Sequence, residues 1–122
     1  MSKVLIVDDD RTTVTLLQTL LDMDGFSVRA CPRGSAVLET MQTEKPDVVL
    51  MDYNLADMKG LEVLRNIRAR PEFAHTVVVM TSGLDMRAEC EAAGADTFLL
   101  KPFEPGKLAD LFNTLISQRT GI

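Results

Sequence analysis

Charged and hydroxyl side chains follow several short apolar runs of this sequence, at the point where each run ends. Three consecutive aspartates, Asp8–Asp10, come directly after the first run, and Asp52 closes a later one. Thr81 follows another apolar run, and Lys101 follows the last. If these runs are parallel strands of one sheet, their carboxyl ends meet at one edge, where ligands of open α/β sheets bind. The pattern therefore predicts a site of carboxylates, a hydroxyl and an ammonium group.

These groups are suited to phosphoryl transfer. Three carboxylates placed close together repel one another, and a hard divalent cation that prefers oxygen ligands, such as Mg²⁺ or Mn²⁺, relieves the repulsion. An aspartate can act as a nucleophile and form an aspartyl-phosphate. Lys101 can pair with phosphoryl oxygens, and the Thr81 hydroxyl can donate a hydrogen bond to one of them. Phosphoryl transfer needs mainly positioning and charge neutralisation, and these groups supply both.

The apolar runs have the composition of buried parallel strands. They are β-branched or apolar throughout, as strands covered on both faces are, and they span residues 4–7, 48–51, 77–80 and 98–100. Residues 26–30 alternate instead, which predicts an edge strand with one exposed face. Helical patterns fill the intervals, and residues 108–116 have the strongest amphipathic spacing.

Strands that alternate with helices in this way predict an α/β fold. We expect a flavodoxin-like, doubly wound (βα)5 three-layer sandwich with a five-stranded parallel sheet in the order 2-1-3-4-5. Right-handed βαβ crossovers place helices on both faces of such a sheet. This order puts Asp8 and Asp9 beside Asp52, and it assigns the alternating strand to an edge. We expect residues 1–122 to form a single domain.

Composition and charge exclude several classes of protein. The chain has 122 residues, 46% of them apolar and 25% charged, with a net charge of −5, values that suit one globular domain. The basic residues form no stripe, so we expect no direct binding of nucleic acid. No apolar run approaches the roughly 20 residues that span a bilayer, and no signal peptide is evident, so we expect a cytoplasmic protein without membrane association. Cys31 and Cys90 lack metal-site spacing and are expected to be reduced, and His75 is expected to be solvated.

Five short motifs occur in order along the chain: Val7-Asp8-Asp9, Asp52 after its apolar run, Met80-Thr81-Ser82, Ala93-Gly94-Ala95-Asp96 and Lys101-Pro102-Phe103. Together they resemble the receiver (CheY-like) domain of bacterial response regulators, and the resemblance covers essentially the whole chain. It implies that Asp52 accepts a phosphoryl group from a sensor histidine kinase or a phosphotransfer protein.

The resemblance also implies roles for the residues around the acceptor. Asp9 would ligate Mg²⁺ directly, Asp8 mostly through water, and Asn54 through its main-chain carbonyl, with Asp52 completing the set. Lys101 would counter the charge of the phosphoryl group, and a cis peptide bond would follow it.

A switch and an output face are implied as well. On phosphorylation, Thr81 would be drawn toward the phosphoryl group and bind it, and Phe98 would turn inward. This change would alter the surface formed by the fourth helix, fifth strand and fifth helix, which would bind a downstream protein target or output domain. Leu111, on the last helix, is either a core leucine or an exposed residue of this face beside Phe98, and both interpretations stay open.

An enzyme is the main alternative. Asp8, Asp10 and Thr12 match the Asp-x-Asp-x-Thr motif of haloacid dehalogenase-type phosphatases, in which Asp8 would be the nucleophile. No acidic pair follows the last strand, however, and Asp52 would have no role. A flavodoxin-type electron carrier is disfavoured because the first loop is acidic where a phosphate cradle would lie. We expect a signalling phosphoacceptor that catalyses only its own phosphorylation and dephosphorylation, as a standalone receiver or as part of a longer regulator.

Overall fold

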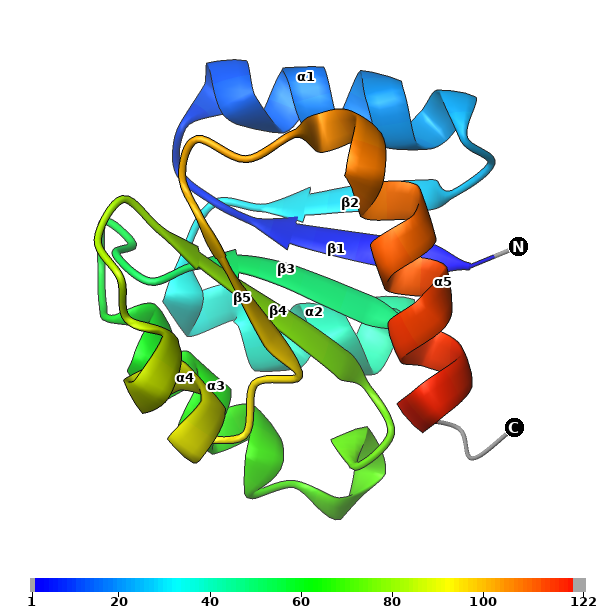
Figure 1. Ribbon diagram of the computed structural model, residues 1–122. Coiled ribbons are helices and arrows are strands. Elements are labelled where there is room, and N and C mark those ends of the chain that lie inside the picture. Colours follow the sequence, from blue (N-terminus) through cyan, green and yellow to red (C-terminus); the bar gives the residue numbers. More distant parts are fainter. Residues whose placement is uncertain (1, 120–122) are drawn as a thin grey trace.

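The apolar runs form one parallel sheet in the computed structural model, which describes residues 2–119. The strands are β1 (Lys3–Val7), β2 (Ser27–Cys31), β3 (Val48–Asp52), β4 (Val77–Ser82) and β5 (Thr97–Leu100). Their order is β2-β1-β3-β4-β5, and each neighbouring pair is parallel (Figure 1). The flavodoxin-like order predicted from the sequence is confirmed, with β1 directly beside β3.

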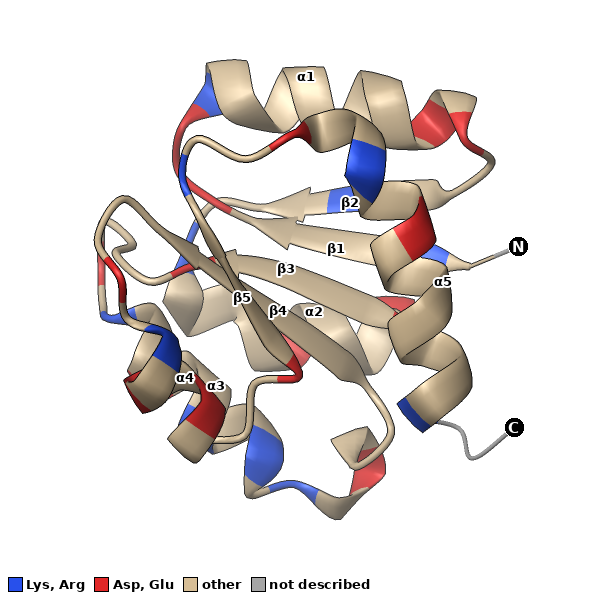
Figure 2. Cartoon of the chain, in the orientation of Figure 1, with Lys and Arg blue, Asp and Glu red and all other residues tan. Residues whose placement is uncertain are grey.

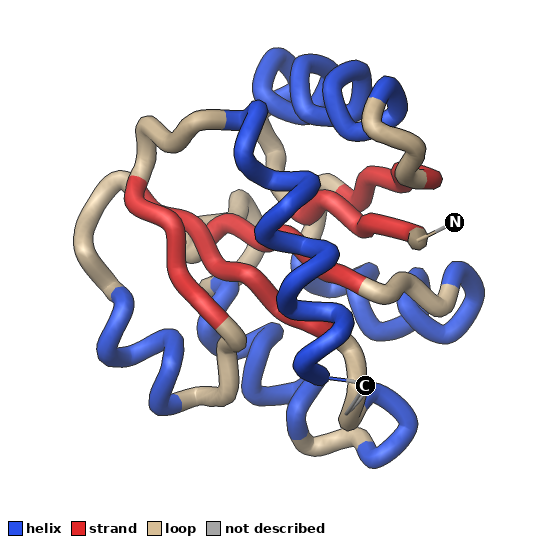
Figure 3. The backbone as a smooth tube through the Cα atoms, turned by 45° about the vertical axis from the view of Figure 1, so that its right-hand side comes forward, coloured by secondary structure: helices blue, strands red, loops and turns tan. Residues whose placement is uncertain are grey.

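Helices cover both faces of this sheet. Within the described residues they are α1 (Arg11–Met23), α2 (Val37–Glu44), α3 (Gly60–Arg68), α4 (Arg87–Ala92) and α5 (Leu108–Arg119). Helices α1 and α5 lie on one face, and α2, α3 and α4 lie on the other (Figures 1 and 3). The three predicted layers are therefore present. No helix within residues 2–119 combines the length and the apolar character needed to cross a membrane.

Central strands send side chains into both helical layers, which is why they are apolar throughout. In β1, Leu5 and Val7 pack in the layer of α2, α3 and α4, whereas Val4 and Ile6 pack in the layer of α1 and α5. All four are at most 1% exposed. Burial of a side chain of this size contributes about 1.5–3 kcal/mol, so the sheet is a stable support for the loops at its ends.

Strand β2 lies at the sheet edge, as its alternating pattern predicts, but it begins at Ser27 rather than at Phe26. Phe26 is 4% exposed, and its ring meets that of Phe112 edge-on with 6.0 Å between the ring centroids. The Phe26 backbone N donates to the Leu21 carbonyl of α1 at 3.1 Å, so Phe26 belongs to the turn after α1 and the strand begins one residue later. Arg29 and Ala30 of β2 are exposed, in keeping with an edge position.

Local contacts shape the two loops that carry the aspartates. Asp10 is the N-cap of α1, and its carboxylate accepts hydrogen bonds from the Thr12 backbone N at 3.1 Å and the Thr13 hydroxyl at 3.0 Å. Such a cap satisfies backbone donors that have no partner inside the helix. Gly60 begins α3 against the end of β3, where a Cβ would collide with the Asp52 carbonyl oxygen. Glycine at this position allows α3 to approach the end of β3.

Both cysteines are free thiols in the interior, as expected. Burial, together with the nearby Glu89 and Glu91 carboxylates, raises the pKa of Cys90 to about 11, so this thiol is protonated at neutral pH. His75 is exposed, and its Nδ1 lies 3.3 Å from the Arg119 carbonyl oxygen. In the part of the chain that the structure describes, none of these side chains belongs to a cluster that could hold a metal ion.

Candidate functional site

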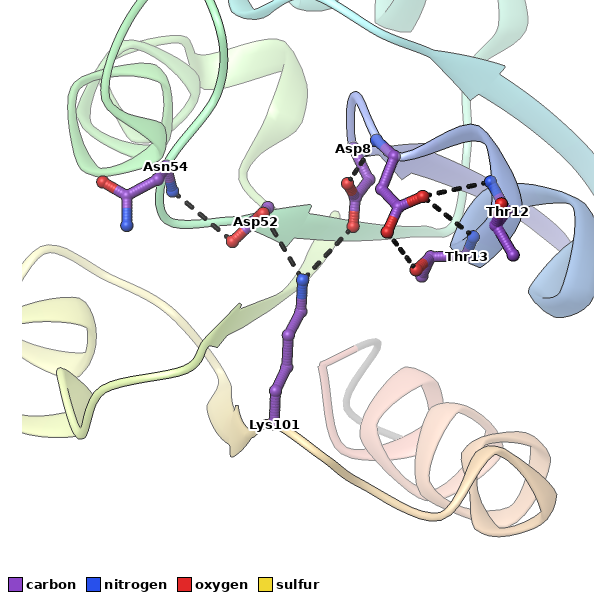
Figure 4. Close-up of polar contacts among 7 residues, drawn as sticks. Asp8, Thr12, Thr13, Asp52, Asn54 and Lys101 are labelled. Atoms are coloured by element: carbon purple, nitrogen blue, oxygen red, sulfur yellow. Dashed lines mark hydrogen bonds and ion pairs between the residues drawn. The ribbon is translucent and has the colours of Figure 1, made fainter.

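Asp8, Asp52 and Lys101 converge at the carboxyl edge of the sheet. Asp8 follows β1, Asp52 is the last residue of β3, and Lys101 follows β5. The Lys101 Nζ lies 3.4 Å from Oδ2 of Asp8 and 3.4 Å from Oδ2 of Asp52 (Figure 4). Because β4 separates β5 from β3, the long lysine side chain has to reach past the end of β4 to meet both carboxylates.

The three carboxylates predicted to bind a metal ion form one cluster. Asp8, Asp9 and Asp52 each place a ligand oxygen within 4.8 Å of the others. Asp8 is 7% exposed, and its Oδ1 accepts a hydrogen bond from the Asp10 backbone N at 2.9 Å, whereas Asp9 is exposed. Three carboxylates that open to water on one side suit a hard, partly hydrated cation such as Mg²⁺ better than a metal that prefers sulfur or imidazole. The donor set therefore fits the predicted ion.

Burial and neighbouring charges act together on the protonation of this centre. Burial raises the pKa of Asp52, Lys101 opposes the shift and Asp8 adds to it, so the pKa lies above the ordinary value of 3.8. For Lys101, burial lowers the pKa, but the Asp52 and Asp8 carboxylates outweigh burial and leave it above the ordinary 10.5. Lys101 is therefore charged at neutral pH and partly neutralises both aspartates.

Asp52→Asn is expected to raise the melting temperature at neutral pH when divalent cations are removed. A carboxyl group whose pKa is raised by folding destabilises the folded state once it ionises, and this cost disappears below the unfolded-state pKa near 3.8. The gain should therefore shrink as the pH falls toward about 3. Thermal melts of both proteins in EDTA across this range measure the effect, and a gain that does not change with pH would contradict it.

Strand register places Thr81 beside Asp52. Thr81 pairs with Asp52 between β3 and β4, and it is 3% exposed. Its carbonyl accepts a hydrogen bond from the Tyr53 backbone N at 2.8 Å. The next residue, Ser82, is also buried, and its Oγ accepts a hydrogen bond from the Leu84 backbone N at 3.2 Å. The residues at the end of β4 are thus held in place around the end of β3.

Asn54 presents its backbone, and not its side chain, to Asp52. Its backbone N lies 3.4 Å from Oδ1 of Asp52, and its side-chain oxygen accepts a hydrogen bond from Lys59 Nζ at 3.0 Å. The Asn54 side chain points away from Asp52 and Lys101 (Figure 4). Sequence reasoning did not identify Lys59, because its contact depends on an isolated antiparallel bridge between Asn54 and Lys59 that has no periodic signal.

The same arrangement of strands and helices occurs in known proteins. The sequence model of the response regulator receiver domain family matches residues 4–113. The chain belongs to this family.

Curated relatives of this receiver domain include proteins of two lengths. Sporulation initiation phosphotransferase F of Bacillus subtilis is 31% identical over 109 residues, and the match covers 88% of each chain. The cell cycle transcriptional regulator CtrA of Caulobacter vibrioides is 28% identical over 122 residues, which are 98% of this chain and 52% of the relative. The receiver domain thus spans about half the length of the transcriptional regulators that it matches.

Solved structures agree with the fold of the receiver domain. The chemotaxis response regulator CheY4 of Vibrio cholerae superposes with a TM-score of 0.86 at 28% identity, covering 94% of this chain and 98% of that one. The receiver domain of Francisella response regulator 1452 superposes with a TM-score of 0.88 at 26% identity, covering 97% and 98%. The Lys101–Pro102 peptide bond of this receiver domain is cis, as the resemblance implied.

Of the two interpretations of Leu111 that the sequence leaves open, the structure of this receiver domain supports the core leucine, because Leu111 does not lie beside Phe98. Phe98 is 1% exposed and packs in the layer of α2, α3 and α4. Leu111 is partly buried in the opposite layer, together with Leu99. Successive strand residues point to opposite faces of a sheet, and α5 covers the face of Leu99. The exposed apolar side chains around β4 and β5 are instead Leu84, at 72%, and Leu100, at 50%.

Proposed function

We propose that this receiver domain accepts a phosphoryl group on Asp52 from a sensor histidine kinase or a phosphotransfer protein. The proposal rests on the placement of the Asp52 carboxylate, which lies in a cluster with two further carboxylates and 3.4 Å from the Lys101 ammonium group. The Asp52 side chain is 15% exposed, against 7% for Asp8. Asp52 is therefore the more accessible of the two carboxylates that contact Lys101.

The proposed step transfers a phosphoryl group from nitrogen to oxygen. A carboxylate oxygen of Asp52 attacks the phosphorus of a phosphohistidine, an O–P bond forms as the N–P bond breaks, and the imidazole nitrogen leaves with the electron pair. Lys101 then pairs with the charged phosphoryl oxygens, and the Thr81 hydroxyl donates a hydrogen bond to one of them. Such positioned charges are the main requirement of phosphoryl transfer.

Asp8, Asp9, Asp52 and the Asn54 main-chain carbonyl would hold Mg²⁺, with Mn²⁺ as a second candidate. The ion would neutralise charge on the transferred group. The cluster of three carboxylates supports this assignment, since Lys101 alone offers one positive charge to them.

Asp9→Ala is expected to abolish stabilisation by Mg²⁺ without lowering stability in its absence. Wild-type protein should melt at a temperature that rises with Mg²⁺ concentration, as RT ln(1 + [L]/Kd) requires. Removing the exposed Asp9 carboxylate removes one ligand, and it also relieves repulsion within the cluster. Thermal melts over a millimolar range of Mg²⁺ measure both effects. Wild-type curves that do not respond to Mg²⁺ would refute the metal assignment.

The phosphatase alternative is disfavoured by how its motif residues are engaged. Asp10, the second aspartate of that motif, caps α1 through Thr12 and Thr13. Asp8 is also held more closely than Asp52, since its Oδ1 accepts from the Asp10 backbone N at 2.9 Å, whereas the bond from the Asn54 backbone N to Asp52 Oδ1 is 3.4 Å long. These contacts favour Asp52 over Asp8 as the nucleophile.

A groove beside the site supports a protein as the phosphodonor. It has a volume of about 410 Å³ and lies between α1 and the loop after β5, where it is lined by Thr13, Leu16, Leu17, Lys101, Pro102, Phe103 and Pro105. Helix α1 has no charged residue between Arg11 and Asp22 (Figure 2). A small phosphodonor has no need of such an extended apolar border, whereas a protein donor can bury it.

Mass spectrometry after incubation with acetyl phosphate and Mg²⁺ tests the proposed function. The expected result is a single added phosphoryl group that maps to Asp52. Protein that takes up no phosphoryl group, or that carries it on Asp8, would overturn the proposal.

We also propose that the face of α4, β5 and α5 carries the signal to a protein target or output domain. Leu100→Arg is expected to weaken binding of that partner about tenfold or more, as loss of a central apolar contact does. Leu100 is half exposed at the end of β5, so folding and phosphorylation should be unchanged. Calorimetric titration with the partner measures the loss.

Leu111→Arg is the matched control for this experiment. Leu111 is partly buried against the layer of α1 and α5, so a charge there should lower the melting temperature. If Leu100→Arg is folded and binds its partner like wild type, Leu100 is not part of the output face.

A further inference from the structure

Helix α4 is short and buries little of its own surface. It has six residues, Arg87–Ala92, and its N-cap residue Met86 makes no capping hydrogen bond. The Asp85 carboxylate accepts a hydrogen bond from the Arg87 backbone N at 3.2 Å instead. Within the helix only Cys90 is fully buried. Helices this short are marginal on their own, so contacts from outside hold α4 in place.

The first of these contacts comes from the residue after the proposed phosphoacceptor. The Tyr53 hydroxyl donates a hydrogen bond to Glu89 Oε2 of α4 at 3.3 Å. The Tyr53 backbone N donates to the Thr81 carbonyl at 2.8 Å. Tyr53 is therefore joined covalently to Asp52, by its backbone to Thr81 and by its side chain to α4.

The second contact comes from Arg87, at the start of α4. One guanidinium nitrogen, Nη2, donates to the Phe98 carbonyl at 2.8 Å, and Nη1 donates to Glu91 at 3.2 Å. The guanidinium carbon lies 5.8 Å from the centre of the Phe98 ring. Arg87 thus covers the buried Phe98 and fastens α4 to β5, a geometry that the planar arginine fork allows and lysine does not.

We propose that Tyr53 is a positioning residue that couples Asp52 to helix α4, through its hydroxyl bond to Glu89, and that Arg87 is the second attachment of this helix. The coupling rests on the proposed phosphorylation of Asp52. A phosphoryl group adds nearly two negative charges at the end of β3, and it attracts the Thr81 hydroxyl beside it as a hydrogen-bond donor. Tyr53, bonded to both residues, moves with them. Its hydroxyl bond at 3.3 Å is close to the limit of hydrogen bonding, so a small shift breaks it.

This route makes α4 the element that responds to the site. Phe98 is 1% exposed and its ring lies under the Arg87 guanidinium, so the ring has to displace Arg87 before it can move outward. Loss of the Tyr53 contact leaves α4 with Arg87 and its buried residue as attachments. The helix then opens more often, which exposes the surface next to Leu84.

Amide hydrogen exchange of residues 87–92 in the full chain tests the coupling. Tyr53→Phe should raise their exchange rates about threefold, the effect of losing one solvent-accessible hydrogen bond. Glu89→Ala serves as the second arm of a double-mutant cycle, and adding Tyr53→Phe to it should have no further effect. Glu91→Ala is the matched control for the cycle: Glu91 bonds Arg87 and not Tyr53, so adding Tyr53→Phe to Glu91→Ala should still raise the rates about threefold. Arg87→Lys should raise the rates about tenfold, because the stacked fork is lost.

The same proteins are then treated with acetyl phosphate and Mg²⁺, and mass spectrometry records phosphorylation of Asp52. In wild type, the amide exchange rates of residues 87–92 should increase on phosphorylation. In Tyr53→Phe the increase should be at most about half of that in wild type, with the same extent of phosphorylation. Wild-type protein that takes up no phosphoryl group overturns the proposed function. The coupling is overturned if Tyr53→Phe is fully phosphorylated and its basal exchange rates equal those of wild type. It is also overturned if the rise in exchange on phosphorylation is as large as in wild type.

Discussion

Asp52→Asn is expected to reduce phosphoryl uptake from about one group per chain to background. An amide at this position is not a nucleophile toward phosphorus, whereas the carboxylate forms an acyl phosphate. The expectation is specific because the remaining groups of the site stay in place: Lys101 still contacts Asp8, and Thr81 still pairs in register with residue 52. Intact mass after incubation with acetyl phosphate and Mg²⁺ measures the uptake.

Two further variants separate the acceptor from its neighbours. Asp22→Asn changes an exposed aspartate on α1, outside the acidic cluster, and should take up phosphoryl groups like wild type. Asp8→Asn removes a proposed metal ligand, so it should slow the uptake while the label still maps to Asp52. Stoichiometric labelling of Asp52→Asn, or a label on Asp8, would show that a different carboxylate is the nucleophile.

Arg68→Ala is expected to lower the free energy of unfolding by about 3 kcal/mol, the size of effect seen when one partner of a buried ion pair is removed. Arg68 donates from Nε to the Gly94 carbonyl at 2.8 Å, from Nη1 to the Thr76 carbonyl at 2.8 Å and from Nη2 to Asp96 Oδ2 at 2.9 Å. The Arg68 and Asp96 side chains are only 15% and 16% exposed. Arg68 also donates to the Phe73 carbonyl at 3.3 Å, so alanine would leave three carbonyls and a carboxylate without this donor.

Asp96 has other partners, which determine how far the free energy of unfolding falls when Arg68 is removed. Asp96 also accepts a hydrogen bond from the Val78 backbone N at 2.8 Å, and its Oδ1 lies 3.4 Å from Nε of Arg119. These contacts still hold the Asp96 carboxylate in its partly buried place after Arg68 is removed. The network joins α3, β4 and the C-terminal turn of α5.

Urea denaturation of Arg68→Ala beside Arg70→Ala measures the effect. Arg70 pairs with Glu72 at 3.6 Å, and both side chains are more than 40% exposed. An exposed pair of this kind contributes at most about 1 kcal/mol. Equal losses in the two variants would show that the Asp96 network does not stabilise the fold.

The layers of the fold and the residues of the site follow from local patterns in the sequence. A strand buried on both faces has to be apolar throughout, and an edge strand has to alternate, so residues 4–7 and 26–30 were distinguishable without a structure. Polar residues directly after such runs have to lie at the carboxyl edge of a parallel sheet. Asp8, Asp52 and Lys101 were therefore expected to lie together. In the structure, Lys101 Nζ lies 3.4 Å from a carboxylate oxygen of each aspartate.

Two things depend on the tertiary structure alone. One is whether a residue at the edge of an apolar helix face is buried or exposed, and the other is which polar groups far apart in the sequence come into contact. Leu111 fits an amphipathic helix whether it is core or exposed, and only the position of α5 over the Leu99 face places it in the interior. Tyr53 and Glu89 are 36 residues apart, and Arg68 and Asp96 are 28 apart. Apolar periodicity records burial along one element, whereas a hydrogen bond depends on the relative placement of two elements to within a few tenths of an ångström. No local pattern carries that information, so these contacts emerge only when the packed layers set the distances.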